Sequence, residues 1–264
     1  MKYLFSDWKR IEKILKDKSI YLFLDYDGTL APIALTPGMA FMPEKTKDIL
    51  RKLSKKSNHK IAIISGRALK DISKRVGLKN IVYVGNHGFE IKGPGVNFKY
   101  HVPPPYRKTL KEIEAKLGKN LSSINGILIE NKGFTLSVHY RLADKKNIPL
   151  VKARFYTVIF PYEFTNNVKV KPGKMVMEVK PPMSWDKGKV VLWLLARYRR
   201  VIHTKKMGIL PIYIGDDITD EDAFGSIKGI GITIFVGRPK KTKAEFYLKN
   251  PEEVTRLLEA MSKI

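Results

Sequence analysis

YLFLDYDGTL, residues 21–30, is an apolar and partly aromatic run that ends abruptly on two carboxylates, Asp25 and Asp27. A short apolar run of this kind, closed by turn residues, predicts a buried strand. In an open α/β sheet, ligands bind in the crevice beyond the carboxyl ends of the strands, so we expect both side chains to project into a functional site. One carboxylate could attack a substrate while the other carries a proton.

Two simpler interpretations compete with this one. An EF-hand calcium loop needs an acceptor at its fifth position and Glu at its twelfth, where this chain has Thr29 and Thr36, so that interpretation fails. A polar turn capped by Asp stays open, because Asp and Gly are ordinary turn residues.

A second apolar strand is expected in ILPIYIGDDITDED, residues 209–222, which releases five acidic side chains within seven residues. The whole chain has 25 Asp and Glu against 50 Lys and Arg, so this cluster is exceptional. Crowded carboxylates repel one another unless a cation neutralises them, and Mg²⁺ binds through one or two carboxylates. We expect Asp216 to bind the metal, whereas the later acids favour the start of a helix and support the site.

Two further segments contribute polar groups beside a strand or a helix. KIAIISGR, residues 60–67, predicts a strand ending at Ser65 and Gly66, whose hydroxyl and backbone N–H groups suit an anion. WDKGK, residues 185–189, precedes an amphipathic helix and places Lys187 near its start as a cation for phosphate. Either segment alone is a weak signal.

Four motifs therefore follow one another along the chain: D-Y-D-G-T-L, S-G-R, D-K-G and G-D-D-x-T-D. Their order and content resemble the signature motifs of the haloacid-dehalogenase-like phosphohydrolase superfamily over residues 20–238. The resemblance implies an α/β fold with a Rossmann-like parallel-sheet core, helices on both faces and a smaller α+β cap domain. It also implies phosphoryl transfer through an aspartate nucleophile.

Carried onto this sequence, the resemblance implies that Asp25 attacks phosphorus and that Asp27 first gives and then takes a proton. The remaining implied roles are phosphate binding by Ser65, Gly66 and Lys187, Mg²⁺ binding by Asp25, Asp27 (through its backbone carbonyl) and Asp216, and support of these groups by Asp217 and Asp220.

Proline-rich segments divide the chain. Pro103–Pro105 and Pro181–Pro182 predict stiff linkers, so we expect a catalytic core of residues 1–102 and 183–264 and a cap of residues 103–182. Within the cap, hydrophobic periodicity predicts the order α-β-β-α-β-β, with one strand running over 135–141.

Further stretches resemble the trehalose-6-phosphate phosphatase family, notably GNHGFE (85–90), ENKG (130–133) and LSVHYR (136–141). The resemblance implies that the cap residues Glu130, Lys132 and Glu178 grip a sugar. It also implies that Arg67, Asn86, His87 and Arg141 line the same cleft. For His87, a histidine that only stabilises its loop is an equal alternative. Lys180 stands where many relatives carry Arg, and Lys lacks the bidentate fork of Arg.

A net charge of +25 invites a nucleic-acid hypothesis. The Lys residues are dispersed along expected helix faces without a recognised binding module, so we expect no specific nucleic-acid partner, only salt-sensitive adhesion. The chain has no Cys, which agrees with a cytoplasmic protein. The longest uncharged stretch, residues 28–43, contains three prolines, so we expect no membrane span. A monomer is expected.

The hypothesis from sequence is thus a Mg²⁺-dependent phosphatase that releases trehalose from its 6-phosphate through an aspartyl phosphate, as in trehalose biosynthesis. Two alternatives stay open: a phosphatase of another sugar or glycosyl phosphate, and a noncatalytic nucleic-acid-binding module on the same fold.

Overall fold

The computed structural model describes residues 1–201, 208–239 and 241–264, which form two compact units. One unit combines residues 1–98 with 185–264, and the other comprises residues 99–184. Both junctions fall close to the proline-rich segments at 103–105 and 181–182.

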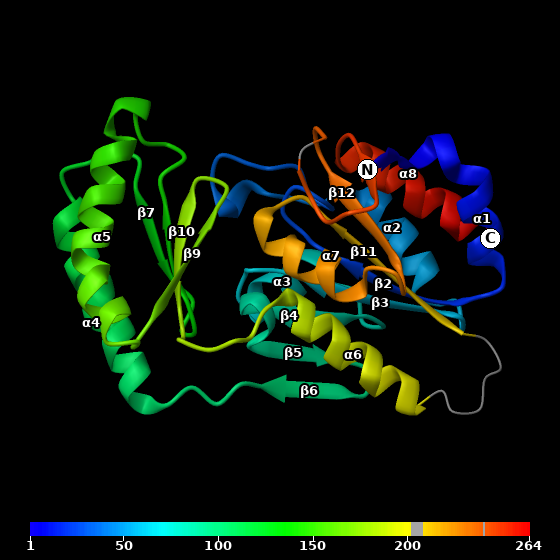
Figure 1. Ribbon diagram of the computed structural model, residues 1–264, viewed down its shortest axis with the longest axis horizontal. Helices are drawn as coiled ribbons and strands as arrows, with labels where there is room; N and C mark the ends of the chain where they lie inside the picture. The colour runs from blue at the N-terminus through cyan, green and yellow to red at the C-terminus, as the bar shows by residue number, and fades with distance from the viewer. Residues whose placement is uncertain (202–207, 240) are drawn as a thin grey trace. The chain divides into compact units, whose positions relative to one another are not determined.

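The first unit is built on a nine-stranded sheet (Figure 1). In the order in which they lie side by side, its strands are β1 (Lys2–Tyr3), β13 (Phe246–Leu248), β12 (Ile232–Val236), β11 (Ile209–Gly215), β2 (Ser19–Leu24), β3 (His59–Ile64), β4 (Val82–Gly85), β5 (Glu90–Gly93) and β6 (Val96–Lys99). From β1 through β4, every neighbouring pair is parallel. Strand β2 lies at the centre, between β11 and β3.

One edge of the sheet departs from the predicted parallel core, because β5 pairs antiparallel with β4. Only the short 3₁₀ turn η3 (Asn86–Gly88) and Phe89 separate the two strands. A connection this short can only reverse the chain, since a parallel crossover needs a dozen residues or more.

Helices cover both faces of this sheet, which confirms the predicted α/β architecture (Figure 1). Alternate residues of β2 serve the two layers: Ile20, Leu22 and Leu24 join one core, and Tyr21 and Phe23 join the other. The first core is completed by α1 (Trp8–Lys16), α2 (Glu44–Leu53), α3 (Leu69–Val76) and α8 (Pro251–Ser262), and the second by α6 (Lys187–Val201) and α7 (Glu221–Ile227). Short 3₁₀ turns are η1 (Leu4–Asp7), η2 (Pro37–Met39) and η5 (Ile218–Asp220).

The second unit follows the predicted order α-β-β-α-β-β. Its elements are α4 (Pro104–Leu121), β7 (Leu128–Asn131), β8 (Leu136–His139), the 3₁₀ turn η4 (Lys145–Asn147), α5 (Ile148–Phe164), β9 (Lys169–Gly173) and β10 (Val176–Lys180). The strands form an antiparallel sheet in the order β7-β8-β10-β9.

Two local predictions for this unit were wrong. Pro104 and Pro105 begin α4 instead of forming a linker, because Pro is favoured in the first turn of a helix, where its missing N–H costs nothing. Strand β8 ends at His139, so Arg141 lies in the following turn. None of the helices within the described ranges is long and apolar enough to cross a membrane.

Candidate active site

Four neighbouring parallel strands place one polar residue each at the same edge of the sheet. Asp216, Asp25, Ser65 and Asn86 are the first residues after β11, β2, β3 and β4, respectively. All four residues are at most 5% exposed. The sheet edge therefore gathers buried polar groups in the crevice where open α/β sheets bind ligands.

Lys187 joins this edge from the first position of α6. Its ammonium donates to Asp25 Oδ1 over 2.8 Å and to Asp220 Oδ1 over 2.7 Å. Helix α6 can approach this closely because Gly188 has no side chain: a Cβ there would lie 2.4 Å from the Asp222 carbonyl oxygen. The structure thus brings Lys187 against the predicted nucleophile.

Asp220 is a structural anchor of this network. Its Oδ1 also accepts from the Tyr213 hydroxyl at 2.7 Å, and its Oδ2 accepts the backbone N–H groups of Asp216 and Asp217 at 3.0 and 2.9 Å. Four donors therefore fill the acceptor sites of this carboxylate. Asp217 is the N-cap of η5, and its backbone carbonyl accepts the Asp220 N–H at 3.1 Å.

Tyr213 is the member of this network that the sequence reasoning missed. The signal available was a single hydroxyl-bearing side chain in an otherwise aliphatic strand, two residues before Gly215. A buried tyrosine hydroxyl needs a partner, and here the partner is Asp220.

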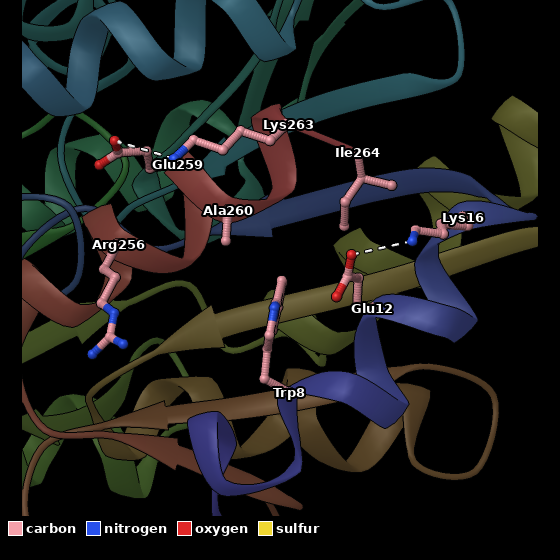
Figure 2. A pocket seen from close by; sticks show the side chains of 8 residues that line it. All are labelled: Trp8, Glu12, Lys16, Arg256, Glu259, Ala260, Lys263 and Ile264. Carbon is pink, nitrogen blue, oxygen red and sulfur yellow. Dashed lines mark ion pairs between the residues drawn. The ribbon is translucent and has the colours of Figure 1, made fainter.

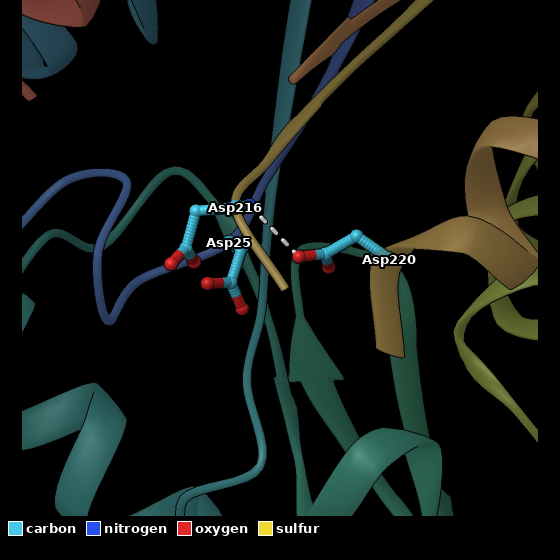
Figure 3. Close-up of side chains that lie close together, drawn as sticks. All are labelled: Asp25, Asp216 and Asp220. Carbon is cyan, nitrogen blue, oxygen red and sulfur yellow. Dashed lines mark hydrogen bonds between the residues drawn. The ribbon is translucent and has the colours of Figure 1, made fainter. Parts of the chain in front are cut away.

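The carboxylates of Asp25, Asp216 and Asp220 have oxygens within 4.8 Å of one another. Figure 3 shows the side chains of Asp25 and Asp216 lying side by side, with Asp220 turned toward the backbone of Asp216. Gly28 makes room for this arrangement, because a Cβ at that position would lie 2.2 Å from Asp216 Oδ2. Since Asp220 is filled by protein donors, Asp25 and Asp216 are the two carboxylates suited to a cation.

The electrostatics of the site favour a bound cation. Burial raises the pKa of Asp25 well above its ordinary value, and the charges of Asp220 and Asp216 raise it further, against the opposing effect of Lys187. A divalent cation would offset both causes and favour the carboxylate form of Asp25. Oxygen donors of this kind fit Mg²⁺.

Burial also opposes the charge of Lys187, but Asp220 and Asp25 outweigh it and hold the pKa of the ammonium well above its usual range. For Asp220, burial likewise disfavours the charged form, yet Lys187 and the donated hydrogen bonds lower the pKa of the carboxyl. The two groups therefore form a buried ion pair.

Asp27 lies in a different arrangement from Asp25. Arg67 holds it in a bidentate ion pair, with Nε donating to Oδ2 at 2.8 Å and Nη2 donating to Oδ1 at 2.5 Å. Arg67 also donates to Asp71 and to the Pro37 carbonyl, and its guanidinium lies over the Tyr26 ring. Four of its five N–H donors are thus committed to protein, whereas the sequence reasoning assigned it to substrate.

The loop after β4 brings His87 to Ser65 and Gly66. Asn86 and His87 both have left-handed backbone angles, with φ of 50° and 55°, which is uncommon for residues other than glycine. Their backbone N–H groups bind the carbonyls of Arg67 and Ser65, and a Cβ on Gly66 would lie 2.5 Å from His87 Nε2. This packing places the imidazole beside the predicted phosphate-binding turn.

The second unit carries its own polar cluster. Glu130 and Glu178 both lie opposite Ser137 in the sheet, so the three share one face. Lys132 Nζ lies 3.3 Å from Glu178 Oε1, and His139 Nε2 lies 3.3 Å from Glu130 Oε2. The predicted residues Glu130, Lys132 and Glu178 therefore gather in one cluster.

Arg141, by contrast, donates to the Lys174 carbonyl from the turn after β8.

A separate groove of about 610 Å³ lies between α1 and α8 (Figure 2). Two ion pairs occupy it, Lys16 with Glu12 at 3.2 Å and Lys263 with Glu259 at 3.9 Å. It is lined by Trp8, Glu12, Lys16, Arg256, Glu259, Ala260, Lys263 and Ile264. It contains none of the strand-end carboxylates, so the edge formed by β11, β2, β3 and β4 is the better candidate for chemistry.

Residues 23–252 match the trehalose-phosphatase family model. The chain belongs to the trehalose-phosphatase family. It is 34% identical to trehalose-phosphate phosphatase B of Arabidopsis thaliana, over 93% of this chain and 67% of the relative. It is 35% identical to trehalose-phosphate phosphatase of Mycobacterium tuberculosis (strain ATCC 25618 / H37Rv), over 92% of this chain and 61% of the relative.

A solved structure agrees with the family. The C-terminal domain of C. albicans trehalose-6-phosphate phosphatase superposes with a TM-score of 0.80 and 26% identity, covering 97% of this chain and 96% of that one. Membership in the trehalose-phosphatase family confirms the resemblance stated from the motifs and makes the protein a phosphoric monoester hydrolase.

Proposed function

We propose that the protein hydrolyses trehalose 6-phosphate to trehalose and phosphate with the help of Mg²⁺, through a phosphoryl group carried on Asp25. The observation that carries this proposal is the buried contact of Lys187 with both Asp25 and Asp220, beside the carboxylate of Asp216. Family membership supplies the substrate class, since its curated relatives are named for trehalose phosphate.

In the first half of the proposed reaction, a carboxylate oxygen of Asp25 attacks phosphorus and the bond to the sugar oxygen breaks. Asp27 gives its proton to that leaving oxygen. Water then attacks the aspartyl phosphate, Asp27 takes the proton of the water, and phosphate leaves with Asp25 restored. Splitting the displacement in this way replaces one difficult step by two easier ones.

Lys187 fixes the orientation of Asp25 and offers a positive charge to the transferring phosphoryl group. Ser65 and Gly66 provide a hydroxyl and a backbone N–H at the adjoining strand end, as phosphate donors. Asp25 and Asp216, together with the backbone carbonyl of Asp27, would hold Mg²⁺. When bound, the ion would reduce the repulsion between the anionic nucleophile and the anionic ester.

Arg67 has a defined part in this scheme. Its bidentate ion pair fixes the direction of the Asp27 carboxylate, which in the second half-reaction accepts a proton from water. The first half-reaction needs Asp27 protonated, so Asp27 must exchange this ion pair for a hydrogen bond to the sugar oxygen. Arg67 is then held in place by Asp71 and the Pro37 carbonyl.

The polar cluster of the second unit is proposed to select the sugar. The carboxylates of Glu130 and Glu178 can accept hydrogen bonds from vicinal hydroxyls, and Lys132 can donate one. Because Glu178 is only 6% exposed and is held by Lys132 and Ser137, its carboxylate has a fixed direction.

The deciding experiment measures Mg²⁺-dependent phosphate release from trehalose 6-phosphate, glucose 6-phosphate and sucrose 6-phosphate. We expect preference for the first and no release with Asp25→Asn, a variant of nearly equal volume. Acid quenching should trap phosphate on the peptide that contains residue 25 in the unchanged protein only. Turnover of a different ester would keep the mechanism and refute the substrate, whereas release by Asp25→Asn would refute the nucleophile.

The substrate assignment has its own test. Glu130→Gln and Glu178→Gln should lose more activity on trehalose 6-phosphate than on a small aryl phosphate, which has no sugar hydroxyls. Equal losses of activity on both substrates would show that this cluster does not select the substrate.

A further inference from the structure

Helix α5 exposes an uncharged face in a strongly charged protein. Eight of its nine exposed residues carry no charge, and Lys152 is the exception. We call the eight the outer face of α5: Pro149, Leu150, Ala153, Tyr156, Thr157, Phe160, Pro161 and Phe164. The larger residues are well exposed, with Leu150 and Tyr156 at 43%, Phe160 at 65% and Phe164 at 81%.

A surface helix usually has one apolar face and one charged face. In α5 the inner face is also apolar, since Val151, Phe155, Val158 and Ile159 pack in the core. The helix lies beside α4 in the layer that covers the four-stranded sheet (Figure 1). A helix that is apolar on both sides is typical of one that is buried on both sides.

The surroundings make this face more unusual. Residues 99–184 contain 16 Lys and Arg and 6 Asp and Glu, yet none of the 22 lies on the outer face of α5. At about 200 Å² for each large side chain, the exposed fractions of the four amount to about 450 Å² of apolar surface. That is as large as the largest apolar patch of a typical monomer, and such patches mark interaction sites.

We propose that the outer face of α5 is a two-fold interface between two copies of this chain. A two-fold contact joins the same patch of both copies, so the patch must complement itself. If two α5 helices pack antiparallel and cross at Thr157, Phe164 of each copy meets Pro149 and Leu150 of the other. Phe160 then meets Ala153, so both phenylalanine rings face smaller side chains and the surfaces interlock.

The charges beside the face fit the same arrangement. Lys152 and Glu163 lie on the same flank of α5, on opposite sides of Thr157 along the helix. An antiparallel pair therefore brings Lys152 of each copy near Glu163 of the other, twice by symmetry. Arg154 lies on the other flank, where its guanidinium donates to the Asn120 carbonyl and the Ser123 hydroxyl instead of facing the second copy.

The same features disfavour other occupants. An acidic partner would be recognised by cations on the face, and the face has none. An anionic lipid surface would be held by several Lys or Arg along the apolar face, and only Lys152 is placed so. The four large side chains expose about 450 Å² per copy, and the four smaller exposed residues bring the face toward the roughly 800 Å² that each partner buries in a standard interface.

The test is analytical ultracentrifugation of the full chain over about a hundredfold range of concentration that ends near 100 μM. The mass should rise from 30.2 kDa toward twice that value. The shift should be stronger at 0.5 M than at 0.15 M NaCl, because salt screens the repulsion between two copies of charge +25 and strengthens apolar contact.

Phe160→Glu should make the protein monomeric at every concentration. The matched control is Ile230→Glu, an apolar residue 50% exposed in the first unit, which should leave the dimer intact. Lys152→Glu should weaken the dimer by facing Glu163 of the other copy, and adding Glu163→Lys should restore it. Phosphatase activity should persist in all of these variants.

An unchanged protein that stays monomeric throughout would overturn the proposal. So would a Phe160→Glu protein that dimerises like the unchanged one. Vesicles of phosphatidylcholine and phosphatidylserine provide the contrasting outcome: binding that is lost in Phe160→Glu, without any dimer, would assign the face to a lipid surface instead.

Discussion

Gly28→Ala perturbs the candidate metal site through a single added methyl group. Gly28 has a φ of +87°, in the left-handed region, and a Cβ there would lie 2.2 Å from Asp216 Oδ2. The backbone strain alone costs about 1–2 kcal/mol. The overlap must also push the Asp216 carboxylate away from Asp25, because the position of the added Cβ is fixed by the backbone and it cannot rotate aside.

Gly229→Ala is the matched control for this change. Gly229 has a similar φ of +81°, and no heavy atom lies within 4 Å of its added Cβ. We therefore expect backbone strain alone to lower the free energy of unfolding of Gly229→Ala, by about 1–2 kcal/mol. The difference between the two variants isolates the contact with Asp216.

The two variants should differ most in how much Mg²⁺ stabilises their folded state. At a concentration 100 times its Kd, a ligand stabilises the folded state by about 2.7 kcal/mol. If displacement of Asp216 weakens Mg²⁺ binding about a hundredfold, that increment falls to about 0.4 kcal/mol. Gly229→Ala should keep the full increment, since its site is untouched.

The assay is urea unfolding of the three proteins with and without Mg²⁺, together with phosphate release from trehalose 6-phosphate. Gly28→Ala should lose both the Mg²⁺ increment and turnover. If it keeps the Mg²⁺ increment of the unchanged protein, the placement of Asp216 against Gly28 as a metal ligand is wrong.

Three further outcomes follow from the hydrogen bonds and burial of single side chains. Arg67→Lys keeps the charge but loses the fork on Asp27, so kcat should fall about 10–100-fold with little change in KM; a rise in KM alone would show that Arg67 contacts substrate instead. Tyr213→Phe removes one donor from Asp220 and should lower the free energy of unfolding by about 1–2 kcal/mol in urea, and no loss would contradict the network. Burial lowers the pKa of His59 from 6.5 to about 4, so the unfolded chain binds the proton more readily. Its contribution to stability is complete above pH 6.5 and is lost as the pH falls toward 4; His59→Phe should flatten this dependence in unfolding curves at pH 7 and 4.5, and an unchanged slope would refute it.

Much of the fold could be predicted because its signals are local. Each apolar run that ends on a polar residue, such as those before Asp25, Ser65 and Asp216, became a strand of the first unit's sheet. Parallel strands align their carboxyl ends, so the polar residues met at one edge. The order of elements in the second unit followed from hydrophobic periodicity in the same way.

The errors arose where local patterns allow two outcomes. A sequence pattern that predicts a strand does not predict whether it runs parallel or antiparallel to its neighbour. Strand β5 runs antiparallel to β4 because η3 is too short for a crossover. Consecutive prolines favour either an extended linker or a helix start, and packing of α4 decided for the helix. The sequence also did not predict that the outer face of α5 is exposed, because the residues of its buried inner face are apolar as well.

The sequence by itself determined which residues lie at the strand ends, because each apolar run and the polar residue that ends it are neighbours along the chain. Only the tertiary structure decided how those carboxylates are used. The carboxylate of Asp220 accepts hydrogen bonds from Lys187 and Tyr213, whereas that of Asp27 is held by Arg67, 40 residues away. The physical reason is that a carboxylate has few acceptor sites, and which donors reach them depends on contacts between distant parts of the folded chain.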